Sequence, residues 1–231
     1  MIGIIGALEI EVERLIENLE EPVRQTCSGI CYVRGRLMGR EAVVTRGGIG
    51  KVNAAVCAQT MAFLYKPSLI INSGVAGALD GNLRAGDVVI GTEIVQHDVD
   101  TTALGDPPGL VSTINRIYFP CDERASQAIL DASKSLDIYA VRGRIASGEQ
   151  FVADSGRKSE IVRLFSASAC EMEAGAIAQV CYLNQIPCAV IRSISDGGDE
   201  SAAMSYEEFL PLAARNSSEL VLEFLRNTAK D

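Results

Sequence analysis

Short apolar runs alternate with amphipathic segments along most of the chain. Runs rich in Ile, Val and Ala indicate strands buried in a sheet, and apolar residues spaced three or four apart indicate helices. The predicted strands cover residues 2–5, 32–37, 42–45, 68–72, 87–90, 93–96, 141–147, 169–171 and 188–194. The predicted helices cover residues 9–19, 52–65, 123–136, 156–165, 173–183 and 205–227. Residues 98–121 lack periodicity and contain Pro107, Pro108 and Pro120, so we expect a long functional loop there.

This alternation predicts the α/β fold class, with a single domain over residues 1–231. We expect a central mixed, twisted β-sheet flanked by helices, because the apolar runs need cover on both faces. Ligands in such folds bind beyond the carboxyl ends of the strands. The segments at those ends are therefore the first places to look for a site, and we expect them to be loops: residues 6–11, 47–50, 73–77, 148–152, 171–173 and 195–198.

Charge and cysteine usage narrow the class of protein. The formal net charge is −9, and the 21 Lys and Arg residues are scattered. Nucleic acid and anionic membranes are therefore poor partners, since both need clustered basic residues. The N-terminus lacks the basic start of a signal peptide, and no apolar stretch is long enough for a membrane span. Seven cysteines without a Cys-x-x-Cys pair, together with a single histidine, His97, favour a reduced cytoplasmic chain without a zinc site.

Two glycine-rich pieces do not carry a nucleotide-binding motif. Residues 3–6 follow a strand-like start but lack the G-x-G-x-x-G spacing of a dinucleotide fold. Gly50-Lys51 is similar to the end of a P-loop, but Thr45 stands at the first glycine and Val52 at the magnesium-binding hydroxyl. We interpret these glycines as turns or close backbone approaches.

Carboxylates remain as the candidate chemistry. Glu11, Glu171, Glu173 and Asp196 all stand at predicted strand ends. Partial burial at such a place raises a carboxyl pKa and suits the group to proton transfer. Position alone also allows a simpler interpretation, in which Glu11 is a solvated helix residue and Asp196 a helix cap or turn former.

Nearly the whole chain resembles the 5′-methylthioadenosine/S-adenosylhomocysteine nucleosidases of the purine nucleoside phosphorylase superfamily. The matching pieces come in the family's order and spacing. They are GIIGALEIE (3–11), GIGKV (48–52), IINSGVAG (70–77), His97-Asp98, Ser147-Gly148 with Phe151, EME (171–173) and RSISD (192–196).

The resemblance implies hydrolysis of the N-glycosidic bond of 5′-methylthioadenosine and S-adenosylhomocysteine, with 5′-deoxyadenosine as a further candidate substrate. Adenine and the 5′-substituted ribose would be released, as methionine salvage and the activated methyl cycle require. Asp196 matches the general acid that protonates adenine at N7. Glu11 matches the base that activates water, and Glu173 matches the residue that binds the ribose hydroxyls. Neither a metal nor an organic cofactor is implied.

The resemblance also implies the remaining contacts. Phe151 matches the ring that stacks on adenine, and Val152 a position whose backbone reads the purine edge. Met172 would pack on the sugar, with Arg192 and Ser195 supporting the centre. Walls of the 5′ pocket and the rest of the predicted substrate-binding set are Ile49, Tyr206, Val75, Ala76, Gly77 and Glu171. A homodimer is implied, with residues 98–121 of one subunit reaching the neighbour's site.

Departures from the family's pattern leave the 5′ group open. Val75 stands where Ser is frequent, and Leu8 and Leu104 stand where Met and Phe are common. The rivals are a futalosine-type nucleoside hydrolase, a nucleoside phosphorylase on the same fold, and a non-catalytic nucleoside-binding protein. The related phosphorylases carry Arg at the place of Asn72 to clamp phosphate. Asn72 and the acidic Glu11 therefore favour water over phosphate.

Overall fold

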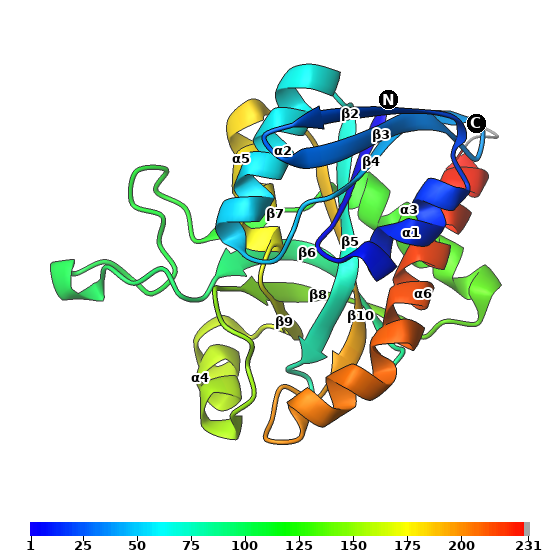
Figure 1. Cartoon of the computed structure of the whole chain (residues 1–231). Coiled ribbons are helices and arrows are strands. Elements are labelled where there is room, and N and C mark those ends of the chain that lie inside the picture. Colours follow the sequence, from blue (N-terminus) through cyan, green and yellow to red (C-terminus); the bar gives the residue numbers. More distant parts are fainter. Residues whose placement is uncertain (229–231) are drawn as a thin grey trace.

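The computed structural model describes residues 1–228, and within them one mixed ten-stranded sheet forms the centre of the molecule (Figure 1). The strands are β1 (Ile2–Gly6), β2 (Glu20–Cys27), β3 (Ile30–Leu37), β4 (Arg40–Arg46), β5 (Leu69–Ala78), β6 (Val88–Gln96), β7 (Tyr118–Pro120), β8 (Ala140–Ser147), β9 (Ala169–Glu171) and β10 (Cys188–Asp196). The helices are α1 (Glu9–Glu17), α2 (Lys51–Tyr65), α3 (Glu123–Ser133), α4 (Ser155–Phe165), α5 (Ala174–Asn184) and α6 (Ala202–Thr228), with 3₁₀ turns η1 (Thr102–Leu104) and η2 (Lys134–Leu136). The predicted α/β class with a mixed, helix-flanked sheet is confirmed.

The sheet has an open part and a closed part. In the open part, β1 pairs in parallel with β4 and β5, and β2, β3 and β4 form an antiparallel meander at the edge. In the closed part, β5 pairs with both β9 and β10, β10 with β6, β6 with β8, and β8 with β9. These five strands return on themselves as a small barrel. β1, β5 and β10 run in parallel, so their carboxyl ends meet at the same edge.

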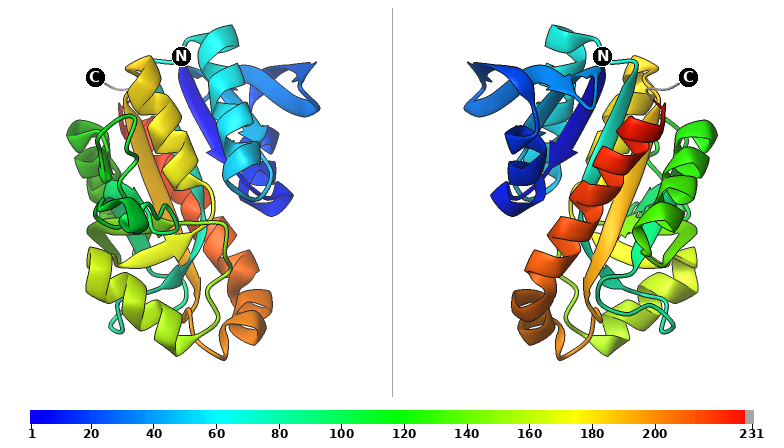
Figure 2. Two further views of the ribbon diagram at one scale, coloured as in Figure 1. Left: turned by 90° about the vertical axis from the view of Figure 1, so that its left-hand side faces the viewer. Right: turned by 90° about the vertical axis from the view of Figure 1, so that its right-hand side faces the viewer.

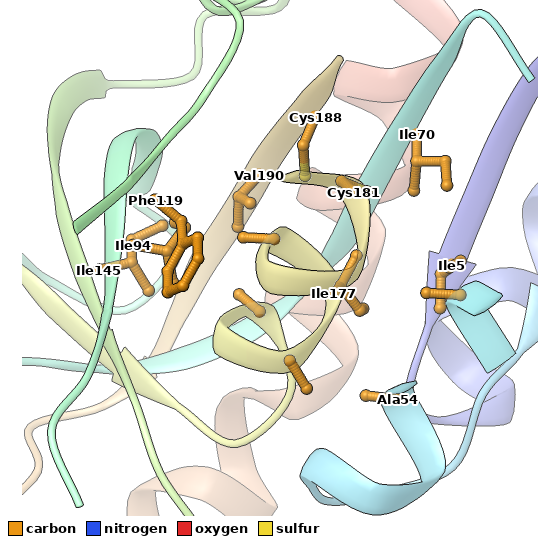
Figure 3. Packing of buried hydrophobic residues seen from close by; sticks show 14 of the residues in the cluster. Ile5, Ala54, Ile70, Ile94, Phe119, Ile145, Ile177, Cys181, Cys188 and Val190 are labelled. Atoms are coloured by element: carbon orange, nitrogen blue, oxygen red, sulfur yellow. The ribbon is translucent and has the colours of Figure 1, made fainter. Parts of the chain in front are cut away.

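Helices cover both faces of the sheet, with α2 and α5 on one side and α6 on the other (Figure 2). Successive residues of a strand point to opposite faces of the sheet, and two neighbouring residues of β1 illustrate this. Ile5 joins the core cluster under α2 and α5, part of which Figure 3 shows, whereas Ile4 joins the cluster under α1, α3 and α6. Because both faces are covered, β1 is buried along its whole length, as its continuous apolar run predicts.

Two stretches that we expected to be loops are strand. Residues 73–77 continue β5, and Ser195 and Asp196 continue β10. The two segments pair with each other in parallel, from Ser73↔Ile191 to Gly77↔Asp196. Their glycines and serines suggested a loop, but the partner strand satisfies the backbone. The predicted strands 87–90 and 93–96 are likewise one strand, β6, with an irregularity between Gly91 and Ile94.

Two strands were not predicted. β2 pairs only with β3 at the edge, and its mostly exposed residues carry no apolar alternation. β7 lies inside the predicted long loop and pairs with β6. The rest of residues 98–121 has few regular elements, as expected, and projects away from the body of the molecule at the left of Figure 1.

Two further features bear on the protein's class. Across residues 1–228, no helix combines the length and the apolar character needed to cross a membrane. All seven cysteines are free thiols, four of them buried. Buried thiols of this kind pack as small apolar groups.

Candidate active site

A cavity of about 300 Å³ opens where the carboxyl ends of β1, β5, β9 and β10 meet. Every predicted site residue lines it except Val152 and Arg192. Its lining consists of Ala7, Leu8, Glu11, Ile49, Val75, Ala76, Gly77, Phe151, Cys170, Glu171, Met172, Glu173, Ser195, Asp196 and Tyr206. Among these described residues there is no Lys, Arg or His, so the charged groups of the wall are all carboxylates.

Glu11 lies in the first turn of α1, and its carboxylate is almost fully buried. One oxygen accepts the backbone N–H groups of Ala7 (2.7 Å) and Leu8 (2.9 Å), and the other accepts that of Val75 (3.0 Å). Gly74 permits this approach, because a Cβ there would lie 2.5 Å from the carboxylate. Burial raises the pKa of Glu11 above its ordinary value, while the charge of Arg192 and the backbone N–H groups lower it in part.

Asp196 ends β10 in a different setting. Its Oδ2 accepts from the Ser195 hydroxyl, and its Oδ1 from the backbone N–H of Gly198, each at 2.9 Å. Gly77 lies so close that a Cβ there would be 2.8 Å from Oδ1. Burial raises the pKa of Asp196, and the two hydrogen bonds oppose this rise without cancelling it. A carboxyl group of this kind keeps a proton more readily than a solvated aspartate, as a general acid requires.

Behind the cavity wall, Arg192 is fully buried on β10. Its guanidinium donates to Glu171 Oε2 (2.5 Å) and to Asn72 Oδ1 (2.5 Å), and Asn72 in turn donates to the Ile5 carbonyl. Arg192 thus supports the site from behind and does not face the cavity, and Asn72 holds Arg192 in place. The cation also balances the charges of the neighbouring carboxylates, since it interacts with Glu171, Glu173 and Glu11.

The two carboxylate oxygens of Glu171 have different surroundings. Its Oε2 accepts the N–H groups of Glu173 (3.0 Å) and Ala174 (2.8 Å) at the start of α5. This caps the helix, whose first N–H groups need acceptors. Its Oε1 is buried and finds no partner among the described residues, although Glu171 lines the cavity. Buried polar atoms are normally paired, so this oxygen is an acceptor that a bound ligand could satisfy.

Glu173 is a third buried acid of the cavity wall. Its Oε1 accepts the backbone N–H of Gly50 at 2.8 Å. Burial and the nearby charge of Glu171 raise the pKa of Glu173 to about 8. Near neutral pH this carboxyl group therefore binds a proton in much of the population and can both donate and accept hydrogen bonds. Such a group suits a pair of sugar hydroxyls.

The mouth of the cavity is apolar and exposed. The rings of Phe151 and Tyr206 meet edge to face, with centroids 5.6 Å apart. Phe151 is 45% exposed and Ile49 is 54% exposed. Val152 is buried in the core cluster that also contains Ile161 and Phe165, and it does not line the cavity. Leu104 is 83% exposed on the projecting segment and does not line this cavity.

Sequence reasoning missed two lining residues. Ala7 and Cys170 line the cavity, but small apolar residues at strand ends give no signal that separates a site from the core. His97, the single histidine, is buried outside the cavity lining. The guanidinium of Arg157 lies 3.0 Å from its Nδ1, and since Arg can only donate, Nδ1 is the acceptor. Burial lowers the pKa of His97, which keeps the ring neutral.

Comparisons with known proteins agree with this geometry. The family model described as the Phosphorylase superfamily matches residues 1–226. A 5′-methylthioadenosine/S-adenosylhomocysteine nucleosidase of Glaesserella parasuis is 41% identical over 229 residues, covering 99% of each chain. The crystal structure of such a nucleosidase from Neisseria meningitidis, in complex with methylthio-immucillin-A, has a TM-score of 0.95 and 38% identity, covering 98% of each chain. A futalosine hydrolase of Helicobacter pylori has a TM-score of 0.93 and 32% identity, covering 98% of this chain and 97% of that one.

Proposed function

The chain belongs to the phosphorylase superfamily and, within it, to the 5′-methylthioadenosine/S-adenosylhomocysteine nucleosidases, and we propose that it hydrolyses the N-glycosidic bond of these two nucleosides. The products are adenine and the 5′-substituted ribose. One observation carries the proposal: Glu11 and Asp196 are both buried, both hydrogen-bonded in place, and both line one cavity. The family match over residues 1–226 supports treating the whole chain as one catalytic domain.

In the proposed reaction, Asp196 gives its proton to N7 of adenine while the bond between C1′ and N9 breaks. The electrons of that bond leave with the base, and the added proton neutralises the charge that would otherwise build there. Glu11 removes a proton from water as the water oxygen bonds to C1′. Each proton transfer of this kind is worth about 10²–10⁴-fold in rate. The use of one carboxyl group as acid and a second as base for water resembles the arrangement of inverting glycosidases.

The remaining carboxylates support the sugar. Glu173 is placed to bind the two ribose hydroxyls, and Met172 to pack against the ring. As the bond breaks, the sugar gains positive charge, which the carboxyl oxygens of the wall stabilise electrostatically. The positive charge of Arg192, behind the wall, reduces the repulsion between the neighbouring carboxylates, so they can lie close together in one buried place.

The absence of cations from the described cavity lining favours water over phosphate as the nucleophile. Phosphorolysis needs a basic clamp, but Arg192 is bound to Glu171 and Asn72. The N–H of Val75 already donates to Glu11. A phosphate entering here would meet carboxylates and no basic side chain.

The second candidate is hydrolysis of a futalosine-type nucleoside. The similarity to the Helicobacter pylori futalosine hydrolase favours it. The bond broken would be of the same kind, with a different group at the 5′ carbon. The two candidates therefore differ at the walls formed by Leu8, Ile49 and Tyr206, where Leu8 departs from the family's usual Met.

A homodimer completes the proposal. α2 and α5 pack side by side, and their outer faces expose large apolar residues, as does the tip of the projecting segment. The exposed residues are Val52, Val56, Phe63, Leu64, Tyr182, Leu183 and Leu104. Exposed large apolar residues gathered on neighbouring elements are typical of an interface. In the proposed dimer these helices pack against their copies, and residues 98–121 of one subunit reach the neighbour's cavity mouth. The free thiols support a cytoplasmic enzyme, and the proposed substrates and products fit methionine salvage.

The test is a substrate panel in which free base is followed with and without phosphate. It contains methylthioadenosine, S-adenosylhomocysteine, 5′-deoxyadenosine, aminodeoxyfutalosine and inosine. We expect adenine release from the first two without phosphate. Preferred cleavage of aminodeoxyfutalosine would support the second candidate, and a requirement for phosphate would overturn hydrolysis. Light scattering of wild type against Leu104→Ser reports the dimer, which we expect the substitution to weaken.

A further inference from the structure

The first turn of α2 lies at the cavity rim, immediately after Ile49 and Gly50. Gly50 is the N-cap residue and has no side chain that could accept a hydrogen bond. Instead, the carboxylate of Glu149, which lies 98 residues further along the chain, accepts the N–H of Lys51. Gly50 has φ +91°, and a Cβ there would lie 2.7 Å from Glu149 Oε2. The backbone at the start of α2 therefore leaves room for a carboxylate from a distant segment. The positive end of the helix dipole stabilises the negative charge of that carboxylate.

Asp98 joins the same two residues. Its Oδ1 pairs with the Lys51 ammonium at 2.6 Å, and its Oδ2 accepts the backbone N–H of Glu149 at 2.9 Å. Lys51, Asp98 and Glu149, which we name the clasp, therefore form a closed ring of three hydrogen-bonded contacts. The Lys51 and Asp98 side chains are only 18% and 24% exposed, so water screens the pair less than it screens the ion pairs on the surface.

Two members of the clasp belong to segments that form the rim, and the third begins the projecting segment. Lys51 follows Gly50, whose N–H donates to Glu173 in the cavity. Glu149 precedes Phe151 by two residues. Asp98 begins the projecting segment 98–121. A second tie reinforces the same arrangement, because Arg157 donates to the Gln150 side chain at 3.2 Å and to His97.

None of the three clasp residues lines the cavity, so their effect on a ligand must pass through the residues they hold. Phe151 is nearly half exposed and lies in the middle of residues 148–154, which form neither helix nor strand, so its contact with the Tyr206 ring does little by itself to fix its position. Holding a binding residue in its bound position removes the ordering cost from the binding step. The clasp supplies that constraint between Glu149 and the rigid start of α2.

We propose that Lys51, Asp98 and Glu149 are positioning residues for adenine recognition, which hold Phe151 against the base and Gly50 on Glu173. This rests on the proposed function, in which Phe151 stacks on adenine. The clasp also ties the adenine wall to residues 98–121 of the same chain. An adenine site and the segment that reaches the neighbouring subunit are thereby fixed by the same three side chains.

The test measures adenine binding by calorimetry and methylthioadenosine turnover in parallel. Asp98→Asn keeps the size of the side chain but removes the charge that pairs with Lys51. We expect the Kd for adenine and the KM to rise about tenfold, with kcat changed less than about threefold, since the loss concerns binding geometry. The matched control is Glu93→Gln, which breaks the similarly buried Arg144–Glu93 pair away from the cavity and leaves Kd and KM unchanged.

A double-mutant cycle with Phe151→Ala separates positioning from general stability. If the clasp acts through Phe151, Asp98→Asn weakens adenine binding less than about twofold in the Phe151→Ala background, because coupled residues are non-additive. A full tenfold loss in that background would overturn the proposal. Lys51→Arg should keep most of the affinity that Lys51→Met loses, and equal losses would also overturn it. Coupled adenine binding without methylthioadenosine hydrolysis would leave the clasp standing and refute the proposed function.

Discussion

The floor of the cavity and its rim are built in different ways. The floor places Glu171 and Asp196 at strand ends, Glu173 just after β9, and Glu11 in the first turn of α1. All four are buried, and backbone N–H groups donate to each of them. The rim places Ile49 and Phe151 on exposed segments between elements, where apolar surface faces solvent. Fixed, desolvated carboxylates suit bond breaking, whereas an exposed apolar mouth suits the recognition of a variable group. The floor therefore determines the reaction, and the rim determines which nucleoside enters.

The largest expected loss comes from the floor. Glu11→Gln removes the base that takes a proton from water, and its amide places an N–H₂ group among donors that point at the carboxylate. We expect kcat to fall by about 10²–10⁴-fold, the usual worth of a general base. Adenine release from methylthioadenosine measures it, with circular dichroism to show that the variant is folded. A fall of less than threefold would mean that the floor does not activate water.

At the rim, Phe151→Ala should raise KM and leave kcat nearly unchanged. Stacking of a base on an aromatic ring is worth about 1–3 kcal/mol, so we expect a rise of roughly fivefold to 150-fold. Because the ring is half exposed, Tm should change little. A loss that falls on kcat instead would show that rim and floor are not separable in the way the structure suggests.

The pH dependence of folding stability provides a further test of the floor. Because the pKa of Glu173 is raised to about 8 from 4.5, this carboxyl group holds its proton more tightly in the folded chain than in the unfolded one. Its contribution is complete below the unfolded value and is lost as pH rises through about 8. Glu173→Gln should therefore have a higher Tm than wild type at alkaline pH, with the difference vanishing in mild acid. Thermal melts across that range measure it, and a constant difference would contradict the assigned burial.

The smallest effect is expected at the 5′ wall of the rim. Leu8→Met restores the residue that the family commonly carries and changes side-chain volume little. Such exchanges cost less than about 1.5 kcal/mol, so the ratio of kcat/KM for methylthioadenosine over S-adenosylhomocysteine should shift by less than about tenfold. Comparing the two substrates in one assay measures it. A change in the total rate with both substrates alike would place Leu8 in the floor instead.

Sequence reasoning reached the floor better than the rim for a physical reason. Glu11, Glu173 and Asp196 follow apolar runs that mark strands, and parallel strands bring their carboxyl ends together. The resemblance to a nucleosidase family then attached a role to each of them. Gly74 and Gly77 contribute to the same site, since each lets a carboxylate lie close to the backbone.

The features that could not be predicted from the sequence depend on contacts with residues far away in the chain. Residues 73–77 read as a loop from their glycine and serine content, but pairing with β10 makes them strand. Edge strand β2 has no buried face and so no apolar alternation. No local pattern reveals that Glu149 caps a helix that begins 98 residues earlier. Tertiary contacts of this kind override local propensity, and they determine most of the rim.

The central claim is that paired carboxylates direct water, and not phosphate, to the ribose. The most direct measurement follows adenine release from methylthioadenosine by wild type and Asp196→Asn in buffers with and without phosphate, and identifies the sugar product. The account predicts phosphate-independent release of adenine and methylthioribose by wild type, and a loss of about 10²–10⁴-fold in Asp196→Asn. A sugar 1-phosphate as product, or near-normal turnover in Asp196→Asn, would contradict it.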